Sequence, residues 1–215
     1  LLHPADQLVL MMNRIYRSGM TTTSGGNLSI LDENGDIWIT PSGVDKGSLT
    51  RADMCCVKPD GAVLGPHKPS VELPFHASVY RRRPDIHAML HAHPPALVAF
   101  SVARVLPDIK LVANSYKTLQ ALTMAQYAVP GSELLGDYIS AEFERGYNIV
   151  VMENHGVVIG ADNLFDAFKR FETLESTAKL EINARRLGEL KSLQESEINL
   201  TNTRTHLTMD EFVLG

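Results

Sequence analysis

Glycine and proline residues are spread along the whole chain and divide it into short segments with different apolar periods. The chain has 215 residues, of which 15 are Gly and 11 are Pro. Between these breaks, some segments repeat apolar residues at helical spacing, and others alternate apolar with polar residues as strands do. No internal repeat or low-complexity linker interrupts the pattern, although the tail from about residue 192 is polar and weakly patterned, and its segment 210–213 is a candidate docking segment. We therefore predict one α/β domain over residues 1–215.

Several segments combine an apolar stripe of helical period with capping residues. The stripe at 4–17 is followed by Gly19, which favours a helix end. Arg81, Arg82 and Arg83 are interpreted as the solvated end of a second helix, where the helix dipole favours cations. We predict helices over 4–17, from the N-cap Ser70 to about 83, over 132–143, and after the cap Asp162. The last helix has a stripe expected in the core, formed by Leu164, Phe168, Phe171, Leu174 and Ala178.

Strands are predicted where apolar and polar residues alternate or where short apolar runs end at turn residues. Segments 28–30 and 37–39 alternate on either side of Asn34-Gly35, which predicts a hairpin. Three further strands are predicted over 86–93, 148–153 and 157–159.

The composition excludes several classes of protein. Lys and Arg number 20 against 25 Asp and Glu, giving a formal charge of −5, whereas a general nucleic-acid binder carries the opposite balance. No apolar run approaches the roughly 20 residues that span a bilayer, so no membrane segment is expected. Cys55 and Cys56 are the two cysteines, and neighbouring residues rarely reach disulfide geometry. We interpret both as reduced, which favours a cytoplasmic protein.

Two histidines, His91 and His93, lie two residues apart in the predicted strand 86–93. Residues two apart in a strand point to the same face, so both imidazoles can converge on one cation. Neutral imidazole is a good ligand for Zn²⁺. Alone, the pair is equally typical of two partly buried histidines with hydrogen-bond partners.

A third histidine, His155, lies in the predicted turn between the last two strands, where Gly156 gives the backbone freedom. A histidine at such a tip can be aimed at a site on a neighbouring strand. Three histidines would leave the fourth position of a tetrahedral zinc for substrate or a movable ligand. The alternative is a solvated turn histidine, and spacing alone does not decide between the two.

Glu72 lies in the first turn of the helix predicted to begin at Ser70, and His76 follows one turn later. A carboxylate there is favoured by the helix dipole and can be a capping charge only. Next to a metal it could instead ligate the ion, or leave it and move a proton.

Two turns, at 23–29 and 40–43, combine glycine with small hydroxyl residues. Such turns present N–H and O–H donors in a concave surface that suits anions such as phosphate. The Ser70 amide at the predicted helix start is a third donor of this kind. Neither turn matches a Walker loop or a dinucleotide fingerprint, and ordinary tight turns have the same composition.

Taken together and in order, these motifs resemble the class II aldolase/adducin family, and within it the zinc-dependent L-fuculose-1-phosphate aldolases. The resemblance runs from the first predicted helix to about Gly188, which is most of the chain. Several motifs in a fixed order are far more specific than any one of them. The matching segments are SGGNLS at 24–29, ITPSG at 39–43, KPSVE at 68–72, RPDI at 83–86, LHAHP at 90–94 and ENHG at 153–156.

The resemblance implies a fold, a metal site and an anion pocket. The family fold is a three-layer α/β/α domain with a central, mainly antiparallel sheet, and its aldolases are homotetramers with active sites at subunit interfaces. By this resemblance His91, His93 and His155 would hold the zinc, and Glu72 would be the displaceable fourth ligand and the proton acceptor and donor. The phosphate pocket would be lined by Gly26, Asn27, Ser42, Gly43, Ser70 and Val71.

The activity implied is that of a lyase acting on a small phosphorylated sugar. It would cleave L-fuculose 1-phosphate or a similar ketose 1-phosphate to dihydroxyacetone phosphate and a hydroxyaldehyde, with zinc stabilising the enediolate. Within the same family the alternatives are a sugar-phosphate epimerase, a dehydratase, or a hydroxy- or keto-acid decarboxylase. Glu72 disfavours the epimerases, which resemble this pattern with Asp at that place. A non-catalytic, adducin-like interaction domain is a third hypothesis, and the full set of metal-site residues argues against it.

The sequence departs from the aldolase pattern at two places. Those aldolases usually have a second serine where this chain has Val71, so one hydroxyl is lost while the backbone N–H stays. They also use a tyrosine from a neighbouring subunit about 20 residues after the second zinc histidine, judged by analogy, and the segment 110–114 offers none. Tyr116 lies close to that place, but the aldehyde-side proton donor is left unassigned.

Overall fold

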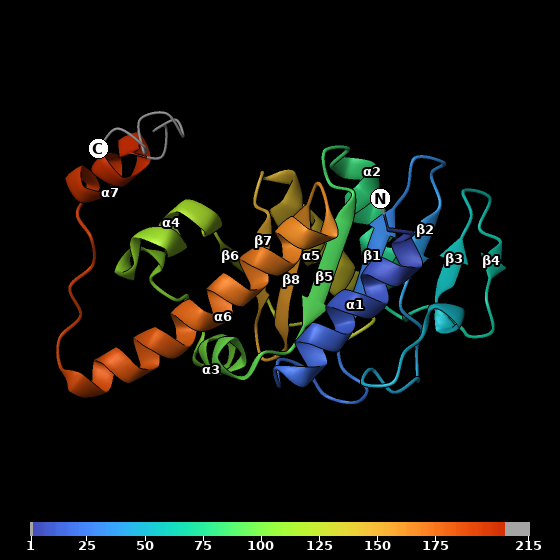
Figure 1. The fold of residues 1–215 in the computed structure, drawn as a ribbon, viewed down its shortest axis with the longest axis horizontal. Helices are drawn as coiled ribbons and strands as arrows, with labels where there is room; N and C mark the ends of the chain where they lie inside the picture. The colour runs from blue at the N-terminus through green and yellow to red at the C-terminus, as the bar shows by residue number, and fades with distance from the viewer. Residues whose placement is uncertain (1, 205–215) are drawn as a thin grey trace, which may run out of the picture.

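The computed structural model describes residues 2–204, and its centre is an eight-stranded sheet (Figure 1). The strands lie in the order β4-β3-β2-β1-β5-β8-β7-β6. Neighbouring strands are antiparallel except β6 and β7, so the prediction of a mainly antiparallel sheet is confirmed. The bounds are β1 Asn27–Leu31, β2 Ile37–Ile39, β3 Cys55–Val57, β4 Val63–Leu64, β5 Ala88–Ala92, β6 Thr123–Ala125, β7 Ile149–Met152 and β8 Gly156–Ala161.

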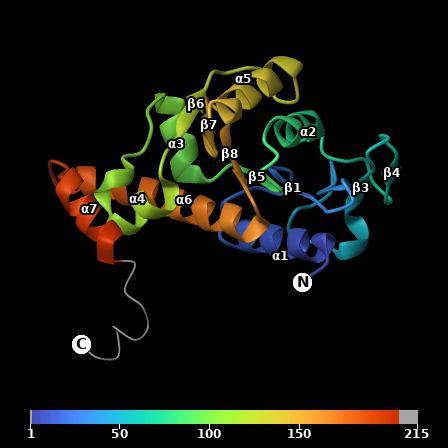
Figure 2. The same cartoon turned by 90° about the horizontal axis from the view of Figure 1, so that it is seen from above.

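Helices cover both faces of the sheet and make the three layers expected of the fold (Figure 2). Helices α1, α3 and α6 pack on one face, and α2 and α5 pack on the other. The predicted stripe on α6 lies in the core of the first face. The bounds are α1 Pro4–Arg17, α2 Leu73–Arg82, α3 Pro95–Ala103, α4 Ala113–Leu119, α5 Glu133–Glu144, α6 Leu164–Leu187 and α7 Glu195–Arg204.

The alternation of side chains along β1 and β5 decides what reaches the face under α2. Leu28 and Leu90 point into the core beneath α1 and α6, whereas Met89 packs under α2 and α5. Because successive side chains in a strand point to opposite faces, His91 lies on the same side as Met89. The ring of Phe75, on α2, lies edge-on to the His91 ring at 6.4 Å between centroids. Polar residues of β1 and β5 are thereby collected under the start of α2.

Two predicted helix starts are shifted in the structure. Helix α2 begins at Leu73 rather than at Ser70, and Glu72 is its N-cap residue. Pro74 accounts for this start, because a residue without an N–H is tolerated only in the first turn. The cap of α6 is Asn163, whose side chain accepts from the Asp166 N–H at 2.9 Å, and not Asp162 as predicted.

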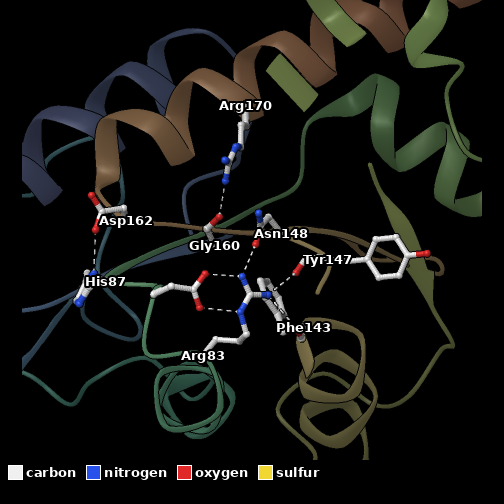
Figure 3. A network of polar contacts seen from close by, with 9 residues as sticks. Arg83, His87, Phe143, Tyr147, Asn148, Gly160, Asp162 and Arg170 are labelled. Atoms are coloured by element: carbon white, nitrogen blue, oxygen red, sulfur yellow. Dashed lines mark hydrogen bonds and ion pairs between the residues drawn. The ribbon is translucent and has the colours of Figure 1, made fainter. Parts of the chain in front are cut away.

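The interpretation of the three arginines at the end of α2 as a solvated helix end is wrong for Arg83 (Figure 3). Its guanidinium donates to both carboxylate oxygens of Asp85, at 2.8 and 2.7 Å. It also donates to the backbone carbonyls of Phe143 and Tyr147 and to Oδ1 of Asn148. Arg83 therefore joins the end of α2 to the end of α5 and the start of β7, because its planar fork can serve several acceptors at once.

The remaining predictions concern the cysteines, the tail and the membrane. Cys55 and Cys56 are buried and free, as expected. Helix α7 lies within the tail that showed little pattern, while the segment 210–213 lies outside the described residues. Among the described residues, the helices all lack an apolar stretch long enough to cross a bilayer. That 1–215 forms a single domain stays a prediction.

Candidate metal and substrate site

Three histidines from two loops and a strand end come together on the α2 side of the sheet. In the ladder between β5 and β8, His91 pairs with Val158 and Ala92 with Val157, so the end of β5 lies beside the β7–β8 turn that carries His155. The Nε2 atoms of His91 and His93 are 3.0 Å apart. One nitrogen from each of the three rings lies within 4.8 Å of the others. The structure thus brings the three predicted ligands to one point.

Gly156 is required by a close approach, not by the special backbone freedom that the sequence suggested. A Cβ at this position would lie 2.5 Å from the carbonyl oxygen of Ala92 and 2.8 Å from Cδ2 of His93. The residue of the turn in the left-handed region is instead Asn154, with φ of 54°. Gly26 also makes a close approach, since a Cβ at this position would lie 2.6 Å from the His91 carbonyl oxygen. Both glycines let neighbouring loops close on the histidine strand.

The histidine rings are held neutral by burial. Desolvation lowers the pKa of His91, His93 and His155 to about 4 in each case. His91 donates from Nδ1 to the Val157 carbonyl at 3.0 Å, which leaves the lone pair on Nε2. A metal-binding imidazole is usually oriented in this way, by a hydrogen bond from the ring nitrogen that does not bind the metal to a carbonyl oxygen.

Glu72 faces this cluster from the start of α2. Its Oε2 lies 3.3 Å from Nε2 of His91, and its Oε1 lies 4.0 Å from Nε2 of His155. The amide of Asn27 donates to Oε2 at 2.6 Å. Oε1 is buried and has no hydrogen-bond partner among the described residues. A buried carboxylate oxygen is costly without a partner, and here it faces three neutral nitrogens. The donor set of three imidazoles and one carboxylate fits a divalent cation such as zinc.

One cavity contains all ten residues predicted for the site. Five further residues line it: Ser24, Gly25 and Pro41, which lie in the two turns predicted to bind an anion, and Lys46 and Pro130, which were not predicted.

Three of the expected anion donors are used within the protein. The Ser70 N–H donates to the Thr40 carbonyl at 3.3 Å, so it is not the free donor that was predicted. The Ser42 N–H donates to the Lys68 carbonyl at 2.9 Å. These bonds, with the bridge between Pro41 and Pro69, clamp the two turns together. The Asn27 amide is likewise committed to Glu72. The hydroxyls of Ser42 and Ser70 remain as donors to the cavity.

Lys46 adds a positive charge that sequence reasoning missed. Its side chain is 3% exposed, and its ammonium donates to the Pro41 carbonyl at 2.5 Å. Burial lowers the pKa of Lys46. No ion pair joins it to a carboxylate in the part of the chain that the structure describes. No periodic signal marks this position, because it lies in an irregular loop after Gly43.

Comparison with known proteins agrees with this geometry. Residues 6–182 match the family described as Class II Aldolase and Adducin N-terminal domain. The chain belongs to this family. The predicted family and its α/β/α fold are thus confirmed, and with them the expectation of an enzyme of lyase type.

Relatives in the class II aldolase and adducin family have more than one activity. A 5-deoxy-D-ribulose 1-phosphate aldolase of Bacillus thuringiensis serovar kurstaki is 34% identical over 199 residues, covering 90% of this chain and 91% of that protein. A 3-oxo-tetronate 4-phosphate decarboxylase of Haemophilus influenzae is 30% identical over 179 residues, covering 81% and 85%. The solved structure of an L-fuculose 1-phosphate aldolase superposes with a TM-score of 0.81 at 28% identity, covering 95% and 96%.

Proposed function

We propose that this chain is a zinc-dependent aldolase that cleaves a ketose 1-phosphate, such as L-fuculose 1-phosphate or 5-deoxy-D-ribulose 1-phosphate, to dihydroxyacetone phosphate and an aldehyde. The observation that carries the proposal is the Glu72 carboxylate, whose buried Oε1 has no partner among the described residues and faces three neutral imidazoles. Three histidines with a displaceable fourth ligand are typical of catalytic rather than structural zinc.

In this proposal His91, His93 and His155 hold the metal and Glu72 moves the proton. When bound, the zinc ion supplies Lewis-acid stabilisation of negative charge that develops on substrate oxygens. Glu72 removes a proton from the carbon next to the ketone in the condensation direction and returns it in the cleavage direction. Asn27 holds one carboxylate oxygen, so the other is left to exchange the proton.

The other end of the cavity is proposed to bind the phosphate. Ser42 and Ser70 offer hydroxyls there, and Gly43 lies between Ser42 and the loop that carries Lys46. A buried ammonium without a carboxylate partner is stabilised when an anion enters, which supports a phosphorylated substrate. Val71, 68% exposed, leaves one side of this pocket without a hydroxyl.

A decarboxylase of a phosphorylated keto acid is the second candidate. It is supported by the relative of that activity, which this chain matches over 81% of its own length. Its substrate would use the same metal ligands and the same anion pocket. The two candidates differ in the carbon–carbon bond that is broken. The aldolase breaks the bond to the carbon that becomes the aldehyde, and the decarboxylase breaks the bond to a carboxylate.

We further propose that the chain works as a cytoplasmic homotetramer with sites at subunit interfaces. Among the described residues that line the cavity there is no tyrosine, and Tyr116 lies on α4, which packs against α6 and α7 away from α2 (Figures 1 and 2). A neighbouring subunit would therefore have to supply the aldehyde-side acid.

A substrate panel tests the proposal. Zinc-loaded protein is incubated with L-fuculose 1-phosphate, 5-deoxy-D-ribulose 1-phosphate and 3-oxo-tetronate 4-phosphate, while dihydroxyacetone phosphate and carbon dioxide are measured. We expect dihydroxyacetone phosphate from at least one ketose 1-phosphate. Carbon dioxide from the keto acid alone would make the decarboxylase the function. No turnover combined with no bound metal would favour the interaction domain.

A further inference from the structure

Behind Glu72, a line of hydrogen-bonded polar side chains runs into the core between β1 and α2. The Asn27 Oδ1 lies 2.5 Å from Nε2 of His76, and Nδ1 of His76 lies 2.6 Å from Oγ of Ser29. The Ser29 Oγ in turn lies 2.7 Å from the hydroxyl of Tyr80. His76 and Ser29 are 0% exposed.

The line is built from two repeating patterns. Asn27 and Ser29 are two apart on β1 and therefore share the face under α2. His76 and Tyr80 are four apart on α2 and therefore share the side that faces the sheet. Around them the cluster is apolar, with Phe75 stacked on the His76 ring at 4.4 Å between centroids. Polar groups in such a place are costly unless each is satisfied.

The chemistry of the groups gives every bond in this line one direction. The Glu72 carboxylate accepts, so Asn27 must present its NH₂ group to Glu72 and its carbonyl to His76. His76 then carries its proton on Nε2 and accepts on Nδ1 from the Ser29 hydroxyl. Ser29 is left to accept from Tyr80. Burial lowers the pKa of His76 to about 3, so the ring is neutral, as one donor and one acceptor require.

We propose that His76, Ser29 and Tyr80 are positioning residues that hold the Asn27 amide with its NH₂ group on Glu72, so that Oε2 is fixed and Oε1 stays free to exchange the proton. The inference rests on the proposed role of Glu72. If His76 took the other tautomer, Asn27 would have to turn its carbonyl toward the carboxylate. That arrangement is repulsive unless Glu72 binds a proton or moves away.

The Ser29 hydroxyl donates to Nδ1 of His76 in this arrangement, and Ser29→Ala is the central variant because it leaves that nitrogen without its donor. We expect kcat to fall by on the order of 10-fold or more, while zinc content and KM stay near wild type, because only the orientation of the reacting group changes. Tyr80→Phe removes a bond one link further away and should have a smaller effect. Ser115→Ala is the matched control, since it also deletes a buried hydroxyl that bonds another hydroxyl, that of Thr177.

Two measurements separate positioning from simple stability. His76→Gln offers a donor and an acceptor on one side chain and should retain far more kcat than His76→Leu. Nitrogen-15 NMR of the histidine rings should find His76 as the Nε2–H tautomer in wild type and as a mixture in Ser29→Ala.

The tautomer result stands whether or not the protein turns over any sugar phosphate. A wild-type protein that is inactive on the whole panel would therefore overturn the proposed function only. An Nδ1–H tautomer of His76, or equal losses of kcat in Ser29→Ala and Ser115→Ala, would overturn the positioning chain.

Discussion

His91 donates its Nδ1–H to the carbonyl oxygen of Val157 at 3.0 Å, and this bond decides which nitrogen of the ring faces the cavity. A carbonyl oxygen only accepts, so the neutral ring keeps its lone pair on Nε2. That lone pair points to Nε2 of His93, 3.0 Å away, and to the carboxylate of Glu72. The Val157 carbonyl of β8 thus leaves Nε2 of His91, on β5, free to bind a cation together with the other two histidines.

The first prediction is that the protein binds about one zinc per chain and that His91→Ala removes most of it. Zinc is measured by elemental analysis after gel filtration. His87→Ala is the control, because His87 lies just before the same strand but pairs with Asp162 at the surface. Full zinc content in His91→Ala would show that His91 is not a zinc ligand.

Chelation should abolish activity and leave the fold intact. The two apolar clusters that support the sheet lie on its two faces and do not include the three histidines. Circular dichroism in the presence of chelator is the measurement. A collapse of the fold would mean that the metal has a structural role.

Glu72→Gln should keep zinc and lose turnover by on the order of 10²-fold or more, because an amide fills the space but cannot accept the proton. Glu181→Gln is a matched control. Glu181 is 1% exposed and Glu72 is 6% exposed, but Glu181 accepts from the Asp108 N–H and from Arg185, away from the cavity. If Glu72→Gln turned over at the wild-type rate, Glu72 would be only a charge at the start of α2.

How far the sequence predicts this molecule depends on whether a signal is local. The hairpin at Asn34-Gly35 and the helix capped by Ser132 follow from neighbouring residues and are confirmed. Strands β3, β4 and β6 were missed, because each has two or three residues and too few alternations to detect. Arg83 was misjudged because its partners Phe143 and Asn148 are about sixty residues away.

The same distinction applies to the site. Each motif was visible separately, and the resemblance supplied their common location. Which N–H groups remain free to bind an anion could not be predicted. The Ser70 N–H, for example, donates to the Thr40 carbonyl because the two loops pack together. Lys46 and the polar line behind Asn27 were not predicted, because the sequence does not show which polar side chains of a loop, strand or helix are buried.

Lys46→Met should raise KM for a phosphorylated substrate by about 10-fold or more, because a hydrogen bond to a charged group contributes about 1.5–3 kcal/mol. The unphosphorylated analogue should be affected little. Lys58→Met is the control, since Lys58 is paired with Asp36 outside the cavity. Equal effects of Lys46→Met on both substrates would place the ammonium away from the anion.

Arg83→Lys should lower the free energy of unfolding by about 1–3 kcal/mol, the range for hydrogen bonds to a charged group and for buried acceptors left without a donor. A lysine cannot serve Asp85, Phe143 and Asn148 together. Arg82→Lys is the matched neighbour, because Arg82 makes one exposed ion pair with Glu144 and should cost little. Urea unfolding of both variants measures this difference. Equal midpoints of unfolding for Arg83→Lys and Arg82→Lys would contradict the bridging role of Arg83.

The last prediction concerns the pH dependence of the metal-free protein. Burial lowers the pKa of His76 from 6.5 to about 3, so between these values an unfolded chain takes up a proton at His76 that the folded protein does not. The unfolded state therefore binds more protons, and the free energy of unfolding falls as the pH falls below 6.5. One such group contributes a slope of up to about 1.4 kcal/mol per pH unit. In His76→Gln this share of the slope should be missing. Urea unfolding with chelator at pH 6.5 and at pH 5 measures it, and the comparison cancels the contribution of the other histidines. Identical slopes in the two proteins would mean that His76 is protonated as readily in the core as in the unfolded chain.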